Sequence, residues 1–384
     1  MRRSWGRAPL PGVILVAIAQ ACGGGSSAPA SAGPATDAGG NADSAGPAGD
    51  VGGPGTGDGP EADSGTKSAA YAALRFADIG PAVLVSNQFY FTEGPVWDPK
   101  KSVLYFTDIN AQDDGGVVDG AIYRLTLPDT IDVLLPSDGN ADGLGLDPQG
   151  NIIAAGFVSR DVWRLSDSGT MTVLAPCAQG SGTCFSGQEV NTPDDITARS
   201  DGVIYFTDPT FGSGSQGFAT ETLPLSGAQG VYRLTTDGML HLEDQTTSGP
   251  NGVNLSPDEK TLYVSYTLSG QVAMFDVAAD GSLSSKKTFA TGATLADSMC
   301  VDAGGNVYVG TISGLAVYDP TGKALGTISA GGLIVTNCAF GGADQKTLFI
   351  TARTQATLSG APPMGGGALY QIASMPVPGI PGQN

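Results

Sequence analysis

Six residues with side-chain oxygens stand at corresponding points of the chain, each just before or at the start of a short apolar run. They are Glu93, Asp142, Asp194, Asn251, Asp297 and Asn337. Carboxylate and amide oxygens are the ligands preferred by hard divalent cations. Four of the six are formally negative, and no Lys, Arg or His stands beside them in the sequence. If they converge in the fold, a divalent cation is the simplest neutralising partner. Asp and Asn also favour turns, so a structural role stays open for each of them.

The single histidine of the chain limits the other chemistry that it could perform. Ser–His–Asp and Cys–His hydrolases need a histidine base, and His-rich zinc sites need several. His241 follows a turn, and we expect it on the polar face of a strand without an orienting partner. The sequence therefore disfavours both kinds of site.

The charge of the chain excludes a further class of partner. Lys and Arg number 18 against 37 Asp and Glu, which gives a formal net charge of −19. This charge repels phosphate backbones, so we expect no nucleic acid partner. The hydrophobic content of 41% is enough for a sizeable core.

The six polar residues recur at intervals of 49, 52, 57, 46 and 40 residues. Each opens a unit of strand, tight turn, strand, loop and strand, as residues 141–165 illustrate. A period of this size with about four short strands is typical of a β-propeller. We predict an all-β fold over residues 71–384, a six-bladed β-propeller whose last blade is closed by an N-terminal strand near 83–85. The first strand of each unit would line the channel, so the six residues would meet at its mouth.

The N-terminus has the plan of a bacterial lipoprotein signal peptide over residues 1–21. Arg2, Arg3 and Arg7 precede a short apolar run and small residues that lead to Cys22, the predicted lipidation site. Residues 22–70 are rich in Gly, Ala, Ser, Pro and Asp, and we predict a disordered linker. We expect an exported protein with a lipid anchor in the cell envelope as its one membrane attachment, or else a periplasmic or extracellular protein.

The cysteines divide into two groups in an exported chain, where disulfides can form. Cys177 and Cys184 bracket a segment of loop composition, and we predict a short disulfide between them. Cys300 and Cys338 each lie inside an apolar strand pattern, and we expect buried free thiols there.

Several motifs, in this order and spacing, resemble the regucalcin/gluconolactonase family over about residues 83–373. They are Phe91-Thr92-Glu93-Gly94-Pro95-Val96-Trp97, Asn191-Thr192-Pro193-Asp194-Asp195, Tyr205-Phe206-Thr207-Asp208-Pro209, Pro250-Asn251-Gly252 and Ala296-Asp297-Ser298-Met299-Cys300-Val301-Asp302. The resemblance implies one divalent cation on the propeller axis, bound by Glu93, Asn251 and Asp297. We expect Ca²⁺, with Mg²⁺, Mn²⁺ or Zn²⁺ as alternatives.

The resemblance also implies that Asp297 is the general base as well as a ligand, and Asp194 is the second candidate for the base. Asp194 stands where the family has an Asn, and its added charge should tighten cation binding. The family's His and paired Arg after the second unit are reduced here to Arg160. We predict that four residues bind the substrate: Asp194, Asn191, Asp142 and Arg160.

The chemistry that fits these expectations is metal-dependent hydrolysis of a gluconolactone-like sugar lactone, or a related ester, by a monomer. One alternative is a non-catalytic, surface-tethered propeller that binds a carbohydrate or protein partner, since a propeller does not dictate function. A strictosidine synthase-like or arylesterase-like propeller is a second alternative. Esterases of the paraoxonase kind rely on histidine, which this chain cannot supply at the channel.

Overall fold

The computed structural model describes residues 71–109, 112–113, 116–117, 120–136, 138–175, 190–211, 228–354 and 366–383. The predictions for the signal peptide, the linker, Cys22, Cys177 and Cys184 lie outside these residues. Within them, no helix has the length and apolar character needed to cross a membrane.

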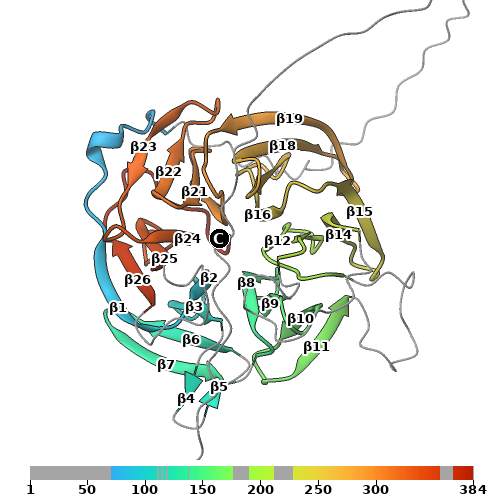
Figure 1. The fold of residues 1–384 in the computed structure, drawn as a ribbon, viewed down its shortest axis with the longest axis horizontal. Coiled ribbons are helices and arrows are strands. Elements are labelled where there is room, and N and C mark those ends of the chain that lie inside the picture. The colour runs from blue at the N-terminus through green and yellow to red at the C-terminus, as the bar shows by residue number, and fades with distance from the viewer. Residues whose placement is uncertain are drawn as a thin grey trace, which may run out of the picture. The chain divides into compact units, whose positions relative to one another are not determined.

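The described residues form six four-stranded antiparallel sheets around one axis, the blades of a β-propeller (Figure 1). Blade 1 consists of β2 (Thr92–Asp98), β3 (Val103–Asp108), β6 (Ala121–Thr126) and β7 (Thr130–Leu135). Blade 2 consists of β8 (Ala141–Leu146), β9 (Ile152–Gly156), β10 (Asp161–Leu165) and β11 (Met171–Ala175). Blade 3 consists of β12 (Ile196–Ala198), β13 (Ile204–Asp208), β14 (Gly230–Leu234) and β15 (Leu240–Gln245).

The second half of the ring repeats this order. Blade 4 consists of β16 (Pro250–Leu255), β17 (Thr261–Tyr266), β18 (Gln271–Val277) and β19 (Leu283–Thr291). Blade 5 consists of β20 (Met299–Val301), β21 (Val307–Thr311), β22 (Gly314–Tyr318) and β23 (Ala324–Ile328). Blade 6 consists of β24 (Ile334–Gly341), β25 (Thr347–Arg353), β26 (Gly367–Ile372) and β1 (Val83–Phe89). A short 3₁₀ helix, η1 (Phe76–Asp78), and a small ribbon of β4 (Gln112–Asp113) and β5 (Gly116–Val117) complete the described elements. The predicted six-bladed propeller is confirmed.

The ring is closed by the N-terminal strand, as predicted. β1 pairs antiparallel with β26, so that Val83 lies opposite Gln371 and Leu84 opposite Tyr370. The first strand of the fold is therefore the outermost strand of blade 6. This pairing joins the two ends of the propeller chain and covers a sheet edge that would otherwise be open.

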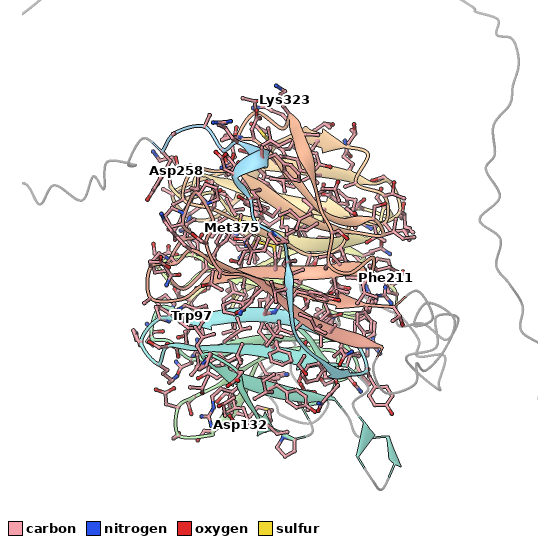
Figure 2. All side chains as sticks on the ribbon, turned by 90° about the vertical axis from the view of Figure 1, so that its left-hand side faces the viewer. Trp97, Asp132, Phe211, Asp258, Lys323 and Met375 are labelled. Atoms are coloured by element: carbon pink, nitrogen blue, oxygen red, sulfur yellow. A yellow bond between two sulfur atoms is a disulfide. The ribbon has the colours of Figure 1, made fainter. Side chains whose placement is uncertain are left out.

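Each hydrophobic cluster of the core combines buried residues from two neighbouring blades. Figure 2 draws these side chains on the ribbon. At the junction of blades 6 and 1, the Trp97 ring stacks on Phe349 with centroids 5.9 Å apart. Gly341 must be glycine here, because a Cβ atom would lie 2.6 Å from the Trp97 ring. Such packing explains why β2, β3 and β24 are buried along their whole length.

A C-terminal tail, residues 373–383, covers blades 5 and 6 at the end opposite the six polar residues. The Met375 amide donates to Lys346 O at 2.8 Å, and Gly379 forms a bridge with Asp302, which follows β20. Met375 and Val377 are 1% and 3% exposed. The tail runs toward the centre of the ring in Figure 1.

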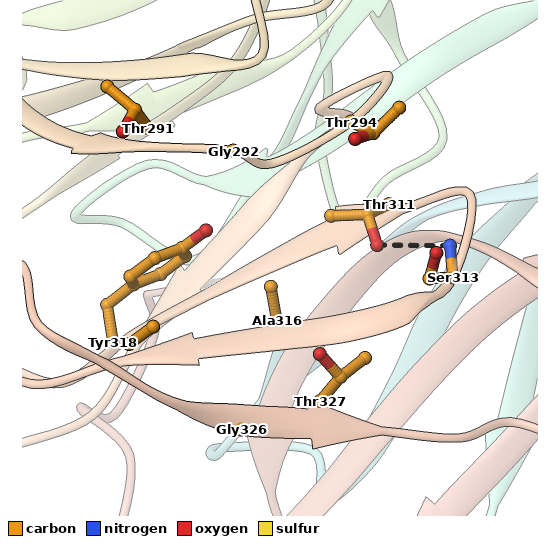
Figure 3. Close-up of a pocket in the computed structure, with 10 residues that line it drawn as sticks. Thr291, Gly292, Thr294, Thr311, Ser313, Ala316, Tyr318, Gly326 and Thr327 are labelled. Atoms are coloured by element: carbon orange, nitrogen blue, oxygen red, sulfur yellow. Dashed lines mark hydrogen bonds between the residues drawn. The ribbon is translucent and has the colours of Figure 1, made fainter.

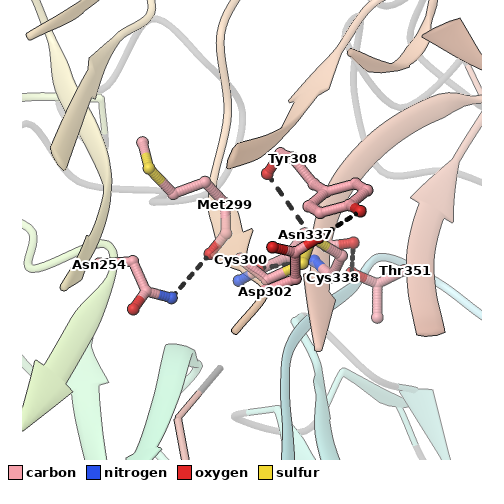
Figure 4. Close-up of a disulfide and its surroundings, with 8 residues drawn as sticks. All are labelled: Asn254, Met299, Cys300, Asp302, Tyr308, Asn337, Cys338 and Thr351. Atoms are coloured by element: carbon pink, nitrogen blue, oxygen red, sulfur yellow. Dashed lines mark hydrogen bonds between the residues drawn. A yellow bond between two sulfur atoms is a disulfide. The ribbon is translucent and has the colours of Figure 1, made fainter. Parts of the chain in front are cut away.

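The expectation of free thiols at Cys300 and Cys338 is wrong. The two residues form a disulfide between β20 and β24, with Cα atoms 5.5 Å apart (Figure 4). Each cysteine lies in an apolar strand of its own unit, so neither strand alone indicates a partner. The closed ring places the innermost strands of blades 5 and 6 side by side, at a separation that a disulfide can span.

Candidate active site

The structure places all six polar residues at the same end of the innermost strands. Glu93, Asp142, Asn251 and Asn337 lie within these strands, while Asp194 and Asp297 each precede one by two residues. Asp297 is partly exposed and the other five are buried, at 7% exposure or less. The blade repeat therefore converts residues about 50 positions apart into one cluster, the channel-mouth cluster.

The four carboxylates of this cluster act on one another through their charges. Burial raises the pKa of Asp142 well above its usual range, and the charges of Asp194, Glu93 and Asp297 raise it further. The pKa of Asp194 and that of Glu93 are raised for the same reasons, burial first and the charge of Asp297 second. The cluster is an acidic site whose ionised form is destabilised unless positive charge is present.

For Asp297, the strongest influences on the pKa after burial come from partners that favour its charged form. Burial raises its pKa to about 6, while the charge of Arg353 and a hydrogen bond with the Asn251 side chain oppose the rise. The Asn251 Oδ1 in turn accepts a hydrogen bond from Ser298 Oγ at 3.3 Å. Two of the three predicted metal ligands, Asn251 and Asp297, are therefore in direct contact.

Hydroxyl groups of neighbouring blades hold the main chain of the cluster in place. Thr107 Oγ1 in blade 1 donates to Asp142 O in blade 2 at 2.9 Å. Thr207 Oγ1 in blade 3 donates to Asn251 O in blade 4. Ser265 Oγ in blade 4 donates to Asp297 O in blade 5 at 2.7 Å. These three bonds hold the main chain of Asp142, Asn251 and Asp297 against the preceding blade, which helps to position their side chains.

Two further buried aspartates support the segments that lead into the cluster. Asp108, at the end of β3, accepts the Phe91 amide at 2.7 Å. Asp208, at the end of β13, accepts the Asn191 and Thr192 amides, each at 2.8 Å. Burial raises the pKa of both carboxyls to about 7, and the amide bonds offset part of that rise. Their role in the structure is to cap backbone amides.

The predicted substrate-binding residues divide into two kinds. Asp142 and Asp194 belong to the channel-mouth cluster. Asn191 is fully buried, and its Nδ2 donates to Asp208 Oδ2 at 3.0 Å. Arg160 donates from Nε to Asn191 O at 2.9 Å and from Nη2 to Val190 O at 3.0 Å. The last two shape the segment before β12, and a contact of either with substrate stays a prediction.

The structure brings a basic residue to the mouth that the sequence reasoning missed. Arg353, the last residue of β25, lies with its guanidinium carbon 4.3 Å from the centroid of the Phe91 ring. Phe91 is two residues from Glu93, and the charges of all four clustered carboxylates act on Arg353. One signal could have found it: Arg353 ends the second strand of its unit, as Asp108 and Asp208 do in theirs.

The cluster has the donor chemistry of a hard cation site. Within the described residues, no three or more His, Cys, Asp and Glu side chains form a ready-made metal site. Carboxylate oxygens of Glu93 and Asp297 and the amide oxygen of Asn251 are nevertheless ligands that suit a divalent cation. The mutual repulsion of the carboxylates, offset in part by Arg353, leaves an excess of negative charge for such an ion.

A concavity of about 260 Å³ lies between blades 4 and 5 (Figure 3). It is lined by hydroxyl-bearing and small residues, including Thr291, Thr294, Tyr318 and Thr327, and by no charged side chain. This concavity therefore offers no carboxylate to bind a cation or to act as a base, unlike the channel-mouth cluster.

Comparison with known proteins decides the family. A family model described as SMP-30/Gluconolactonase/LRE-like region matches residues 188–354. A gluconolactonase of Zymomonas mobilis is 31% identical over 294 residues, which cover 71% of this chain and 79% of that protein. The chain belongs to the SMP-30/gluconolactonase family. The predicted family is therefore confirmed, and the matched region contains Asp194, Asn251, Asp297 and Asn337.

Solved structures of the SMP-30/gluconolactonase family share the fold. A gluconolactonase from Xanthomonas campestris is 29% identical, with a TM-score of 0.64, over 80% of this chain and 94% of that one. A calcium-binding regucalcin from Agrobacterium tumefaciens is 16% identical, with a TM-score of 0.59, over 79% and 96% of the two chains. The second likeness concerns the fold alone.

Proposed function

We propose that this member of the SMP-30/gluconolactonase family is a monomeric, divalent-metal-dependent lactonase that opens a gluconolactone-like sugar lactone at the channel mouth. The convergence of four carboxylates and two amides on one end of the channel is the observation that carries the proposal. The relationship to a gluconolactonase over most of both chains supports the substrate class.

Glu93, Asn251 and Asp297 would hold the cation, which when bound supplies Lewis-acid polarisation of the lactone carbonyl. All-oxygen ligands favour Ca²⁺, and Mg²⁺, Mn²⁺ and Zn²⁺ are the alternatives. The cluster includes no histidine, in accord with a chain whose one histidine, His241, lies in β15.

Asp297 is the residue that takes the proton of the attacking water. The charge of Arg353 and a hydrogen bond with the Asn251 side chain favour its charged form, and a general base must be ionised. The water oxygen adds to the carbonyl carbon, the ring C–O bond breaks, and the ring oxygen receives a proton from Asp297. The products are the hydroxy-carboxylate and one proton, which balances the addition of water.

The test is hydrolysis of glucono-δ-lactone by the full chain, followed in a pH-stat after the protein is stripped with a chelator. We expect turnover to return on addition of Ca²⁺ or one of the three alternative ions, and to be lost in Glu93→Gln. No turnover with any of the four ions would contradict the proposal. Binding of a carbohydrate without turnover would favour the non-catalytic alternative.

We also propose that the protein is exported and anchored by a lipid on Cys22. The order of basic, apolar and small residues before Cys22 supports this location. Cys22→Ser should move the protein from the membrane pellet to the soluble fraction, and an unchanged fractionation would contradict the anchor.

A further inference from the structure

The position of Arg353 is set by the blade structure and by an aromatic ring. In β25, Arg353 pairs with Ile334 of β24 on one side and with Gly367 of β26 on the other, so its main chain lies within a sheet. Its guanidinium carbon is 4.3 Å from the centroid of Phe91. Phe91 is itself held by the bond from its amide to Asp108. The guanidinium is therefore placed by rigid elements of blades 1 and 6.

Arg353 and the clustered carboxylates stabilise one another's charged forms. Asp297, Glu93, Asp142 and Asp194 all stabilise its charged form against burial, in that order of strength. In return, Arg353 is the group that opposes most strongly the rise in the pKa of Asp297. Arg353 is thus an electrostatic partner of the predicted base while remaining partly exposed.

The proposed reaction creates negative charge where the site already has an excess. Four carboxylates and one divalent cation leave two negative charges at the mouth, which disfavour both the oxyanion of the addition step and the product carboxylate. A guanidinium is always charged and has five N–H donors in one plane. This planar fork can bind two oxygen atoms at once, such as those of a carboxylate.

The other arginine near the mouth is committed elsewhere. Arg160 binds the main-chain oxygens of Val190 and Asn191 through Nε and Nη2. Arg160 itself has a left-handed backbone conformation, with φ of 58°, in the turn between β9 and β10. Arg353 differs from Arg160 in lying where the charges of all four clustered carboxylates act on it.

We propose that Arg353 contacts the substrate, donating to the lactone carbonyl oxygen as it becomes negative and to the carboxylate of the product. The inference rests on the proposed lactonase function. It makes Arg353 a catalytic residue that supplies the positive charge for the anion formed in the reaction.

The experiment compares the full-length wild type with Arg353→Ala and Arg353→Lys at saturating cation. Four quantities are measured: kcat, KM, inhibition by gluconate, and cation affinity by calorimetry. Arg124→Ala is the matched control, because it removes an arginine from an ion pair with Asp132 on the outer strands of blade 1.

For Arg353→Ala we expect kcat to fall by about 10², the usual effect of losing one oxyanion donor, and gluconate inhibition to weaken about tenfold. Cation affinity should be unchanged or higher, because a positive charge beside the ligands is removed. Guanidinium chloride at a non-denaturing concentration should restore part of kcat by occupying the place over Phe91, while equal KCl should not. Arg353→Lys, which keeps the charge without the planar fork, should give an intermediate loss.

A structural role would give a different pattern. If Arg353 only balances the carboxylates, Arg353→Ala will change cation affinity or thermal stability, yet keep wild-type kcat and gluconate inhibition at saturating ion. That result would overturn the inference and leave the proposed function intact. If Arg353→Ala does not fold, wild-type kinetics in Arg353→Lys would overturn it equally. A wild type without turnover would overturn the proposed function and this inference with it.

Discussion

The hydroxyl of Ser265 donates a hydrogen bond of 2.7 Å to the main-chain carbonyl of Asp297. The Ser265 hydroxyl oxygen also accepts a hydrogen bond from the Gly252 amide at 2.8 Å. One side chain of β17 thereby connects the strand that carries Asn251 to the segment that carries Asp297. The Ser265 hydroxyl therefore holds the main chain next to Asn251 against the main chain of Asp297.

We expect Ser265→Ala to weaken cation binding several-fold and to lower the free energy of unfolding by about 1–3 kcal/mol, the cost of buried groups left without a partner. Calorimetric titration and denaturant unfolding would measure the two effects. Ser282→Ala is a suitable control, because its hydroxyl donates to Asp280, two residues away in an exposed turn. Unchanged cation affinity in Ser265→Ala would show that the bond does not position Asp297.

The stability of the cation-free protein should fall as the pH rises from about 4 to about 7. Burial raises the pKa of Asp297 to about 6 and that of Asp108 and Asp208 to about 7, from 3.8. The folded state therefore binds more protons than the unfolded state across this window, and each group's contribution is lost as the pH passes its folded pKa. Melting temperatures at several pH values in the presence of a chelator would measure this.

Ca²⁺ should raise the melting temperature more at pH 8 than at pH 5. At pH 5 protons occupy carboxylates that the ion needs, whereas at pH 8 the ion removes a repulsion that the folded state otherwise carries. Glu93→Gln, which keeps an amide oxygen in place of the carboxylate, should reduce the gain at pH 8. An equal gain at both pH values would contradict a cation site made of the clustered carboxylates.

The sequence predicts those parts of the fold that repeat. The six blades, the closing strand and the polar residues before the innermost strands each follow from a local pattern, and each pattern occurs several times. The family also follows from motifs that lie in the strands, such as the one around Asp297. These features need no knowledge of which blade contacts which.

Two parts of the site could not be predicted in this way, because they depend on contacts between different blades. Arg353 is 260 residues from Glu93, and only ring closure brings β25 beside Phe91. Cys300 and Cys338 belong to separate units, and only the closed ring shows that their strands are adjacent. The repeat marks the end of β25 as a site position, as Asp108 and Asp208 show in their units, but it does not indicate which groups Arg353 contacts.

Loss of the disulfide should destabilise the propeller next to the site. The bond closes a loop of 38 residues, for which chain-entropy arguments give about 4 kcal/mol. We expect the double variant Cys300→Ala/Cys338→Ala to unfold at lower denaturant concentration, and wild type treated with a reductant to behave like it. Denaturant titrations with and without reductant would measure the difference. If a reductant still lowers the stability of the double variant, that loss of stability comes from another pair of cysteines.

Asp297→Asn and Asp194→Asn separate the roles of the two aspartates that precede innermost strands. Asp297→Asn keeps an oxygen ligand and loses the base, so we expect weaker cation binding and a fall in kcat of about 10²–10⁴. Asp194→Asn removes a charge that raises the pKa of Asp142. It should lower cation affinity modestly, stabilise the cation-free protein near neutral pH, and leave most of the turnover.

Cation affinity and kcat, measured for both variants at saturating ion, distinguish a ligand from a base. A ligand that is not the base would lose affinity while kcat at saturation stays high, because added ion compensates for weaker binding. A base would lose kcat at every ion concentration. Full turnover in Asp297→Asn would therefore remove Asp297 from the base role, and collapse of kcat in Asp194→Asn alone would transfer that role to Asp194.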